Sequence, residues 1–491
     1  MRSLPSVERL LARPVALRLA EQLGRSHVRD LLRVILDELR QELLEVRSQE
    51  SEVRREAEAT ADFLSHSDSG LLTSDFLLEE IERRLDARGA RAARPSLRRV
   101  INATGVIIHT NLGRAPLAEE SVAALMETAA SYSNLEYDLE RGERGQRESH
   151  CRELLARLAG SEAAIVTNNN AAAVMLVLNT LAEGGEVIVS RGELIEIGGS
   201  FRIPDVMEKS GARLREVGTT NRTRISDYER AINDRTRLLL RVHPSNYRIV
   251  GFTERPSLDE LVELSRRTGI PIFEDLGSGC LIDLAPYGIS DEPVVAASLR
   301  AGISVVSFSG DKMLGGPQAG IIAGTQAIVD RVRRNPLMRA LRCDKLTYAA
   351  LEATLKLYER GLASERVPVI RMMAMSAAEL RDRAERFCDR LMQATGASLR
   401  AEIEAGESVI GGGSAPEVKL PTALVAIHQD GLSASALAER LRSSRTPVIA
   451  RTERDRVLID LRTVAADEES LIVEALTAIA QPVPLPLASV K

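Results

Sequence analysis

A single lysine, Lys312, stands in a glycine-rich turn directly after a short apolar segment of the chain. The apolar segment, residues 303–306, has the pattern of a buried strand. A lysine amine at a strand end is partly desolvated, and such an amine can form a Schiff base with pyridoxal phosphate. The bare backbone of the turn leaves room for this bulky cofactor, and the hydroxyl of Ser309 is placed to bind its phosphate. The stretch therefore suggests a pyridoxal phosphate enzyme.

Two other interpretations compete for the Lys312 turn. A nucleotide-binding P-loop has the spacing G-x-x-x-x-G-K-[ST], but here Asp311 separates Gly310 from Lys312. Met313 also stands where the P-loop requires serine or threonine. The second interpretation is a surface lysine in a glycine turn, and the motif taken alone favours it. The polar residues at other strand ends reverse that preference.

Three further strand ends carry polar residues that suit the same cofactor. Asp275 follows an apolar strand pattern, and a carboxylate there would keep the pyridine nitrogen protonated. Asn246 follows a second strand and could donate a hydrogen bond to the phenolic oxygen of the cofactor. Asn169 and Asn170 follow a third strand and open a helix whose first backbone amides suit a phosphate. Because ligands of open α/β sheets bind at the carboxyl ends of strands, these residues together with Lys312 favour a pyridoxal phosphate fold.

The hydrophobic pattern along the chain predicts the elements that position these residues. With 491 residues, the chain is expected to form two or three domains. Apolar residues spaced by three and four predict an N-terminal helical domain over residues 1–64, followed by a linker with one helix over residues 65–99. Short β-branched runs alternating with amphipathic helices predict a catalytic α/β domain with a mainly parallel sheet over residues 100–365. Residues 366–491 are predicted to form a small C-terminal α/β domain.

Composition predicts a cytosolic protein without a membrane span or a metal site. The chain is 44% hydrophobic and 27% charged, and its net charge of −5 does not by itself indicate nucleic-acid binding. The four cysteines show neither a C-x-x-C pair nor another metal-ligand spacing, which suits a reducing compartment. The N-terminus lacks the apolar core of a signal peptide, and the longest apolar run, residues 171–178, is too short to cross a membrane.

Charge is distributed unevenly within the N-terminal helical domain. Residues 1–35 contain seven arginines and three acidic residues, whereas residues 36–64 contain four arginines and nine acidic residues. One interpretation is a solvated helical hairpin, which charge alone favours. The other is a basic end that contacts RNA phosphates.

Four stretches of the chain resemble the bacterial selenocysteine synthase family, the L-seryl-tRNA(Sec) selenium transferases. They are residues 4–11, 101–117, 307–320 and 341–347. The resemblance implies a fold-type-I pyridoxal phosphate transferase in which Lys312 carries the cofactor. It also implies a homo-oligomeric ring, a decamer assembled from dimers, and an N-terminal domain that binds the transfer RNA.

The resemblance further implies a reaction and a set of site residues. The family converts L-seryl-tRNA(Sec) into L-selenocysteinyl-tRNA(Sec) by eliminating water to an aminoacrylyl-tRNA and adding selenium from selenophosphate. Lys312 would then act as the proton shuttle. Selenophosphate is a small anion that needs fixed cations, and the resemblance and the planar guanidinium geometry both suggest Arg114, Arg339 and Arg342. Asp311, beside the lysine, could orient it or cap the turn.

Four other residues keep two interpretations each. His109 either contacts the cofactor or is a core histidine with satisfied hydrogen bonds. Arg141, Arg144 and Arg147 form a glycine-punctuated loop that either serves the site of a neighbouring subunit or is plain surface.

Two other functions compete with selenium transfer. One is a pyridoxal phosphate lyase acting on a small amino acid or amino sugar, which would not need the N-terminal hundred residues. The other is a non-catalytic RNA-binding protein on a decayed enzyme fold, against which the presence of Lys312, Asp275 and Ser309 argues.

Overall fold

The computed structural model describes residues 4–59, 74–197, 201–290 and 292–481. The chain divides into two compact units, Met1–Arg99 and Val100–Lys491, each with its own internal packing. Across the described residues, no helix is both long enough and apolar enough to cross a membrane.

The described part of the first unit is helical. Its helices are α1 (Val7–Leu11), α2 (Pro14–Leu23), α3 (Arg25–Ala59) and α4 (Ser74–Ala92). Leu10, Leu19, Ile35 and Ile81, one from each helix, are buried in a common core. Gly89 of α4 packs closely on α2, because a Cβ at this position would overlap the Leu19 side chain. The segment is thus a small helical domain with a core of its own.

Helix α4 lies in the segment that we predicted to be a linker with one helix, residues 65–99. Leu77, Ile81 and Leu85 recur every four residues and form a buried face of α4 that packs with α2 and α3. The spacing predicts an amphipathic helix, but it carries no information about which elements cover the apolar face. In the structure, α4 belongs to the helical unit.

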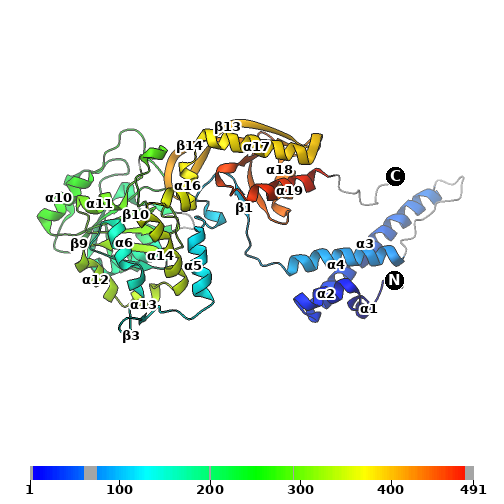
Figure 1. Cartoon of the computed structure of the whole chain (residues 1–491), viewed down its shortest axis with the longest axis horizontal. Coiled ribbons are helices and arrows are strands. Elements are labelled where there is room, and N and C mark those ends of the chain that lie inside the picture. The colour runs from blue at the N-terminus through cyan, green and yellow to red at the C-terminus, as the bar shows by residue number, and fades with distance from the viewer. Residues whose placement is uncertain (1–3, 60–73, 198–200, 291, 482–491) are drawn as a thin grey trace. The chain divides into compact units, whose positions relative to one another are not determined.

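The second unit contains two main sheets, and the larger of them has seven strands (Figure 1). In spatial order the strands are β4 (Ala163–Thr167), β12 (Gly320–Gly324), β11 (Val305–Ser309), β10 (Ile272–Gly277), β9 (Thr236–Val242), β5 (Glu186–Ser190) and β8 (Arg213–Val217). Only β12 runs against its neighbours, and the other six strands share one direction. This arrangement confirms the predicted mainly parallel sheet. It also gathers the residues that follow these six strands at one edge.

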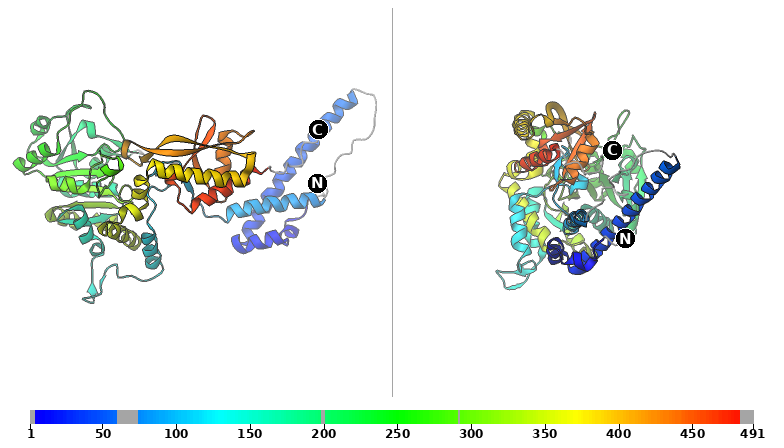
Figure 2. Two further views of the ribbon diagram at one scale, coloured as in Figure 1. Left: turned by 45° about the horizontal axis from the view of Figure 1, so that its top comes forward. Right: turned by 90° about the vertical axis from the view of Figure 1, so that its right-hand side faces the viewer.

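Helices cover both faces of the large sheet (Figures 1 and 2). One face packs against α6 (Arg152–Ala159), α9 (Ile225–Ala231), α10 (Leu258–Thr268), α11 (Val295–Ala301) and α14 (Lys345–Glu359), and the other against α7 (Asn170–Ala182), α8 (Ile203–Lys209) and α12 (Gln326–Arg334). Within β9, Leu239 joins the first layer, while Leu238 and Leu240 join the second. Since successive side chains of a strand point to opposite faces, a strand covered on both sides is apolar throughout.

The C-terminal part of the second unit contains a five-stranded sheet. In spatial order its strands are β1 (Ile101–Ala103), β15 (Val448–Glu453), β16 (Arg456–Asp460), β14 (Ser414–His428) and β13 (Arg400–Gly411). Helices α17 (Ala377–Thr395), α18 (Ala434–Ser443) and α19 (Glu468–Ala480) contribute to its core, and Figure 2 shows α17 along the β13–β14 hairpin. Strand β1 pairs in parallel with β15, so the first residues of the predicted catalytic domain join the small sheet.

Candidate active site at the strand ends

Lys312 lies in the turn that follows β11, and only 5% of its surface is exposed. The turn is held by its own backbone, because the Gly310 N–H donates to Ala319 O over 2.8 Å. From α14, the hydroxyl of Tyr358 donates to Leu314 O over 2.8 Å. The lysine is therefore fixed at the carboxyl edge of the sheet and shielded from water.

The surroundings of Lys312 favour its uncharged form. Burial lowers the pKa of Lys312, and the Arg114 guanidinium lowers it further. The carboxyl groups of Asp275, Asp311 and Glu292 act in the opposite direction but do not cancel the effect of burial. A lowered pKa enlarges the unprotonated, nucleophilic fraction of the amine near neutral pH.

Asp275 is buried at the end of β10, one strand away from the lysine turn. Its Oδ1 accepts hydrogen bonds from Asn170 Nδ2 at 2.8 Å, from Ser307 Oγ at 3.2 Å and from the Gly277 N–H at 3.2 Å. Burial raises the pKa of Asp275, while the hydrogen bond from Asn170 and the charge of Lys312 oppose this shift. These donors hold the carboxyl group in one orientation, as a partner for a ring nitrogen requires.

Arg114 and Asp311 form an ion pair beside Lys312. Arg114 Nη1 lies 2.8 Å from Asp311 Oδ2, and the Asp311 side chain is nearly buried while Arg114 is about one-third exposed. The Arg114 backbone has a φ of +64°, a conformation that costs free energy for a residue other than glycine. Asp311 therefore holds a strained arginine in place and leaves its remaining N–H groups for a ligand.

The asparagines after β4 serve two different purposes. Asn169 is the N-cap of α7, and its side chain accepts a hydrogen bond from the Ala172 N–H at 2.8 Å. Asn170, by contrast, orients Asp275 through its Nδ2. A Cβ on Gly320 of β12 would overlap the backbone of Asn169, so this glycine lets the asparagine turn approach the sheet. The cofactor contacts that we predicted for both asparagines stay predictions.

Ser245, rather than its predicted neighbour Asn246, lies beside the lysine. The Asn246 side chain is exposed, and its Nδ2 donates to Glu196 O over 2.9 Å. Ser245 is buried. A Cβ built on Gly413 would lie 3.6 Å from both Ser245 Oγ and Lys312 Nζ, so these two atoms border the same small space in front of Gly413. A contact of Asn246 with the cofactor stays a prediction, and Ser245 becomes a second candidate.

The tip of the β13–β14 hairpin reaches the active site from the small sheet. Gly411, Gly412 and Gly413 have φ values of +75°, +63° and +70°, a left-handed run that only glycines adopt without strain. A Cβ on Gly412 would overlap the Ile108 side chain. Nothing in the sequence pattern connects this turn with Lys312, although three successive glycines are a visible signal of an unusual backbone.

The residues around Lys312 fit pyridoxal phosphate. The deprotonation-prone amine suits a Schiff base, and the fixed carboxyl group of Asp275 suits the pyridine nitrogen. Ser309 is buried at the end of β11, and its contact with the cofactor phosphate stays a prediction. Asn170 Oδ1 and His109 Nδ1 are buried without a hydrogen-bond partner among the described residues. A polar ligand bound here would supply the missing partners. The described residues include no cluster of metal-binding side chains.

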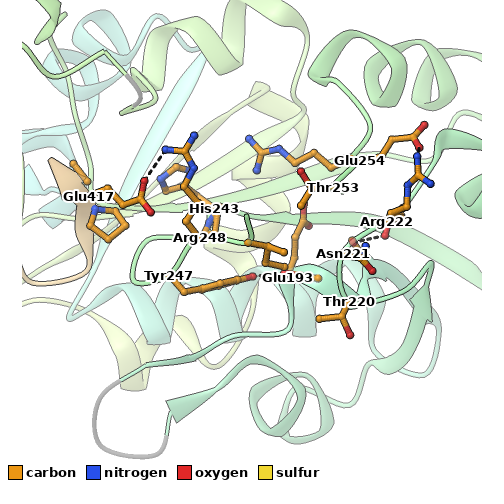
Figure 3. A pocket seen from close by; sticks show the side chains of 18 of the residues that line it. Glu193, Thr220, Asn221, Arg222, His243, Tyr247, Arg248, Thr253, Glu254 and Glu417 are labelled. Atoms are coloured by element: carbon orange, nitrogen blue, oxygen red, sulfur yellow. Dashed lines mark hydrogen bonds and ion pairs between the residues drawn. The ribbon is translucent and has the colours of Figure 1, made fainter. Parts of the chain in front are cut away.

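A cavity of about 690 Å³ adjoins this site, and Figure 3 shows its lining. His243 and Glu292 belong to the lining, and sequence reasoning identified neither. Burial lowers the pKa of His243 to about 4, with further lowering by Arg255, so the imidazole is neutral at pH 7. Burial raises the pKa of Glu292, whose Oε2 accepts a hydrogen bond from the Ala415 N–H at 3.0 Å.

Arg339 and Arg342 line a different cavity, of about 460 Å³. Arg144, Arg147 and Arg333 line it as well. Glu136 is the acidic centre of this cavity: it pairs with Arg144, Arg147 and Arg342. Hydrogen bonding to Arg147 is the main cause of the lowered pKa of Glu136. Within one chain, the three arginines predicted for selenophosphate thus lie in two places, Arg114 at Lys312 and the other two here.

Two family models match this chain. A model described as L-seryl-tRNA selenium transferase matches residues 100–465. A model described as selenocysteine synthase N terminal matches residues 1–40. The first covers the whole candidate active site, and the second covers part of the helical unit.

Individual relatives carry the same name. The chain is 52% identical to the L-seryl-tRNA(Sec) selenium transferase of Geobacter metallireducens over 84% of this chain and 90% of the relative. It is 49% identical to that of Geobacter sulfurreducens over 97% of this chain and 98% of the relative. Among solved structures, D-glucosaminate-6-phosphate ammonia-lyase aligns with a TM-score of 0.54 and 22% identity over 78% of this chain and 96% of that one, a likeness of fold alone.

Proposed function

The chain belongs to the L-seryl-tRNA selenium transferase family, and on this basis we propose that it converts L-seryl-tRNA(Sec) into L-selenocysteinyl-tRNA(Sec). It is a fold-type-I enzyme whose cofactor is pyridoxal phosphate. The observation that carries the proposal is the buried Lys312 amine, which interacts electrostatically with Asp275, Arg114 and Asp311, in a chain that matches the family over residues 100–465.

Lys312 would hold the cofactor and move protons. Pyridoxal phosphate, when bound, withdraws electrons from the amino acid Cα and so makes its proton acidic. The Lys312 Nζ would accept that proton, and burial favours this role because it lowers the pKa of the amine below its ordinary value. The same amine, once protonated, can return its proton to the departing hydroxyl group, which leaves as water.

Asp275 would hold the pyridine nitrogen in its protonated form. Its Oδ1 is anchored by Asn170 and Ser307, so a ring nitrogen meets a carboxyl group that does not have to reorganise. A protonated ring raises the electron demand on which the removal of the Cα proton depends.

We propose selenophosphate as the selenium donor and arginines as its binding groups. Arg114 is the cation beside Lys312, and Asp311 orients it. Arg339 and Arg342 lie in the arginine-rich cavity, where a small anion would find several guanidinium groups. For one donor to use both sets, Arg339 and Arg342 would act in the site of a neighbouring subunit, which agrees with the homo-oligomeric ring, a decamer of dimers, that the family resemblance implies.

Mixing inactive variants tests whether subunits share the site. Lys312→Ala and Arg342→Ala are each expected to abolish selenium transfer. Refolded or exchanged mixtures of the two should regain part of the activity, because some pairs of subunits then carry one complete site. Mixtures that stay inactive while forming mixed oligomers would place Arg342 outside the shared site.

The helical unit is the proposed binding site for the body of the transfer RNA. Arginines of this unit pair with carboxylates at its surface: Arg13 with Glu82, Arg18 with Asp86, Arg25 and Arg29 with Glu8, and Arg33 with Asp30. Exposed ion pairs contribute little to stability, so RNA phosphates can replace these carboxylate partners. We place the reaction in the cytoplasm, where transfer RNAs are charged and used.

A direct assay distinguishes the proposed substrate from a free amino acid. The holoenzyme is incubated with selenophosphate and either L-seryl-tRNA(Sec) or free L-serine, and the selenium-containing product is quantified. Conversion of the charged transfer RNA alone is expected. Equal or better conversion of free serine would contradict the proposal and favour a small-molecule lyase.

A further inference from the structure

The lining of the cavity of about 690 Å³ beside the active site includes none of the residues proposed for the chemistry at Lys312. Figure 3 shows its two ends: one with His243, Tyr247, Arg248 and Glu417, and the other with Thr220, Asn221, Arg222 and Glu254. Its volume falls within the range of about 300–1,000 Å³ that is typical of sites for small organic ligands.

One end of the cavity borders the Lys312 amine. Ala415 lines the cavity, and Gly413, two residues earlier, faces Lys312 Nζ so closely that a Cβ there would lie 3.6 Å from it. Glu292 lines the same end and accepts a hydrogen bond from the Ala415 N–H. His243 also lines the cavity, and the charge of Lys312 contributes to the lowering of its pKa, as expected for two neighbouring side chains. A ligand attached to the reacting amino acid can therefore extend into this space.

The cavity wall offers an aromatic ring and several uncharged hydrogen-bonding groups. The Tyr247 hydroxyl donates to the carbonyl of Gly192, which fixes the tyrosine as part of the wall. Asn221 is held by a hydrogen bond from its Nδ2 to Phe252 O at 2.6 Å. His243 is neutral at pH 7 and can donate or accept a hydrogen bond. Stacking surfaces combined with amide and imidazole groups are typical of sites that bind an unpaired nucleoside.

Three arginines and four glutamates line the same cavity, so positive charge is available to a ligand only where an arginine is not paired with a carboxylate. Arg222 lines the cavity and shares the carboxylate of Glu254 with Arg224, at 3.1 Å and 3.2 Å respectively. Arg248 lies 2.7 Å from the carboxylate of Glu417. The Arg255 side chain also lines the cavity, and within the described part of the chain it forms no ion pair or hydrogen bond. Its charge acts on Glu193 and His243 of the same lining, and a guanidinium that is free of a direct carboxylate contact is suited to a phosphodiester.

We propose that this cavity binds the 3′-terminal adenosine of the charged transfer RNA, with Arg255 and Arg222 at its phosphodiester. The inference rests on the proposed function. In an aminoacyl-tRNA the amino acid is esterified to the ribose of the terminal adenosine, so a seryl group that reacts at Lys312 brings this nucleoside to the neighbouring space. A free amino acid would leave the cavity unfilled, which gives the enzyme a means of preferring charged transfer RNA.

Binding of the trinucleotide CCA to the holoenzyme tests the assignment. A 5′-labelled CCA is titrated with wild-type protein and with Arg255→Gln, Arg222→Gln and Arg224→Gln, and its fluorescence anisotropy is recorded. Arg224→Gln is the matched control, because Arg224 shares Glu254 with Arg222 but does not line the cavity. We expect Arg255→Gln and Arg222→Gln to weaken binding about tenfold, as the loss of a charge-assisted hydrogen bond does. Arg224→Gln should bind like the wild type, and all proteins should keep the absorbance of the bound cofactor.

Equal affinity of CCA for wild type, Arg255→Gln and Arg222→Gln would overturn the assignment. A loss of affinity that is as large in Arg224→Gln would also overturn it, since the effect would then reflect surface charge. The test is independent of selenium transfer. If CCA binds as expected but no selenocysteinyl-tRNA forms, the proposed function fails and the cavity assignment stands. If selenium transfer occurs while the cavity variants bind CCA normally, the cavity assignment fails and the proposed function stands.

Discussion

Lys312, Asp275 and Arg114 have different proposed tasks in the active site, and each depends on its immediate neighbours. Burial lowers the pKa of the Lys312 amine below its ordinary value. Asn170 and Ser307 hold the carboxyl group of Asp275 in one orientation. Asp311 holds Arg114 in a strained backbone conformation. The chemistry at this scale is therefore set by burial and by hydrogen bonds from residues distant in sequence.

Replacing Asp275 by asparagine should remove most of the activity while leaving the fold intact. The change keeps the size of the side chain but removes the negative charge that a protonated pyridine nitrogen requires. We expect selenium transfer to fall by at least about a hundredfold, the scale of a lost catalytic interaction. Asp283→Asn, at an exposed position, is the control. Near-normal turnover in Asp275→Asn would mean that another residue holds the ring.

Glu193 should make the protein less stable as the pH rises. Burial raises the pKa of Glu193 to about 7 in the folded protein, whereas the unfolded chain releases this proton near the ordinary value of 4.5. As the pH rises between these values, only the unfolded chain loses the proton, and the free energy of unfolding falls. The destabilisation is therefore absent below about pH 4.5 and complete above about pH 7. Glu193→Gln should raise the free energy of unfolding at pH 8 by up to about 3 kcal/mol and change it little at pH 4.5. Denaturant titrations of both proteins at pH 4.5 and pH 8 measure the free energy of unfolding. An equal gain in this free energy at the two pH values would contradict the prediction.

Sequence reasoning could place Lys312 and Asp275 at strand ends, because each closes or follows an apolar segment of the chain. It could not distinguish Ser245 from Asn246, since both follow the same strand and only the path of the backbone decides which one is buried. His243 was equally hidden, because its neutral state results from burial and from the charges of Arg255, Arg241 and Lys312, which no local pattern displays.

Two elements that are far apart in the chain shape the active site. The parallel strands bring their carboxyl ends to one edge, where the turns after β10 and β11 carry Asp275 and Lys312. The β13–β14 hairpin comes from the small sheet, and its tip, Gly411–Gly413, lies against the lysine. Backbone hydrogen bonds fix the hairpin to the segment before Arg114: the Ile108 N–H donates to Ile410 O over 2.7 Å. The small sheet is thus part of the site.

A side chain at position 413 should hinder the uptake of the cofactor. The Cβ of Gly413→Ala would lie 3.6 Å from Lys312 Nζ, at the atom that has to bond the cofactor. Gly431→Ala is a matched control, because Gly431 has a similar φ of +80° but no atom within 4 Å of the added Cβ. Both variants carry about the same backbone strain of roughly 1 kcal/mol. We expect apo Gly413→Ala to regain cofactor absorbance about tenfold more slowly than Gly431→Ala; equal rates would show that the space is not needed.

The parallel sheet and its helical covering could be predicted from the apolar strands alone, because period and length distinguish buried strands from amphipathic helices. The arrangement of the small domain could not. Residues 101–103 pair with residues 448–450, and the tip at Gly413 meets Lys312, a hundred residues earlier. Such long-range contacts depend on how whole elements pack, and a pattern within one segment does not record them.

At the scale of the whole molecule, two units have separate cores and separate proposed tasks. The helical unit has its own apolar core, which includes Ile35 and Ile81, and carries the surface arginines. The second unit carries all the residues proposed for the cofactor. A small-molecule lyase would not need the helical unit, so its presence favours a substrate as large as a charged transfer RNA.

Removing residues 1–99 should separate the two tasks. A cut at residue 64 would expose the apolar face of α4, so the truncated protein should begin at Val100, the start of the second unit. We expect it to bind the cofactor normally but to bind L-seryl-tRNA(Sec) at least about a hundredfold more weakly, because phosphate contacts supply much of the affinity for RNA.

In the intact protein, the affinity for L-seryl-tRNA(Sec) should fall steeply with salt. A filter-binding titration of the truncated and the intact protein at several salt concentrations measures the loss of affinity on truncation and the dependence of the affinity on salt. Full affinity and full turnover of the truncated protein would place the transfer RNA contacts in the second unit.

The most direct measurement asks where the cofactor is attached and what displaces it. The holoenzyme is reduced with borohydride, digested and analysed by mass spectrometry, with and without prior addition of L-seryl-tRNA(Sec) or free L-serine. The pyridoxyl group is expected on Lys312 in the resting enzyme. After addition of L-seryl-tRNA(Sec) it should move from Lys312 to the seryl group, and free serine should leave it in place. A pyridoxyl group on another lysine, or one that L-seryl-tRNA(Sec) does not displace, would contradict the assignment of Lys312 and of the substrate.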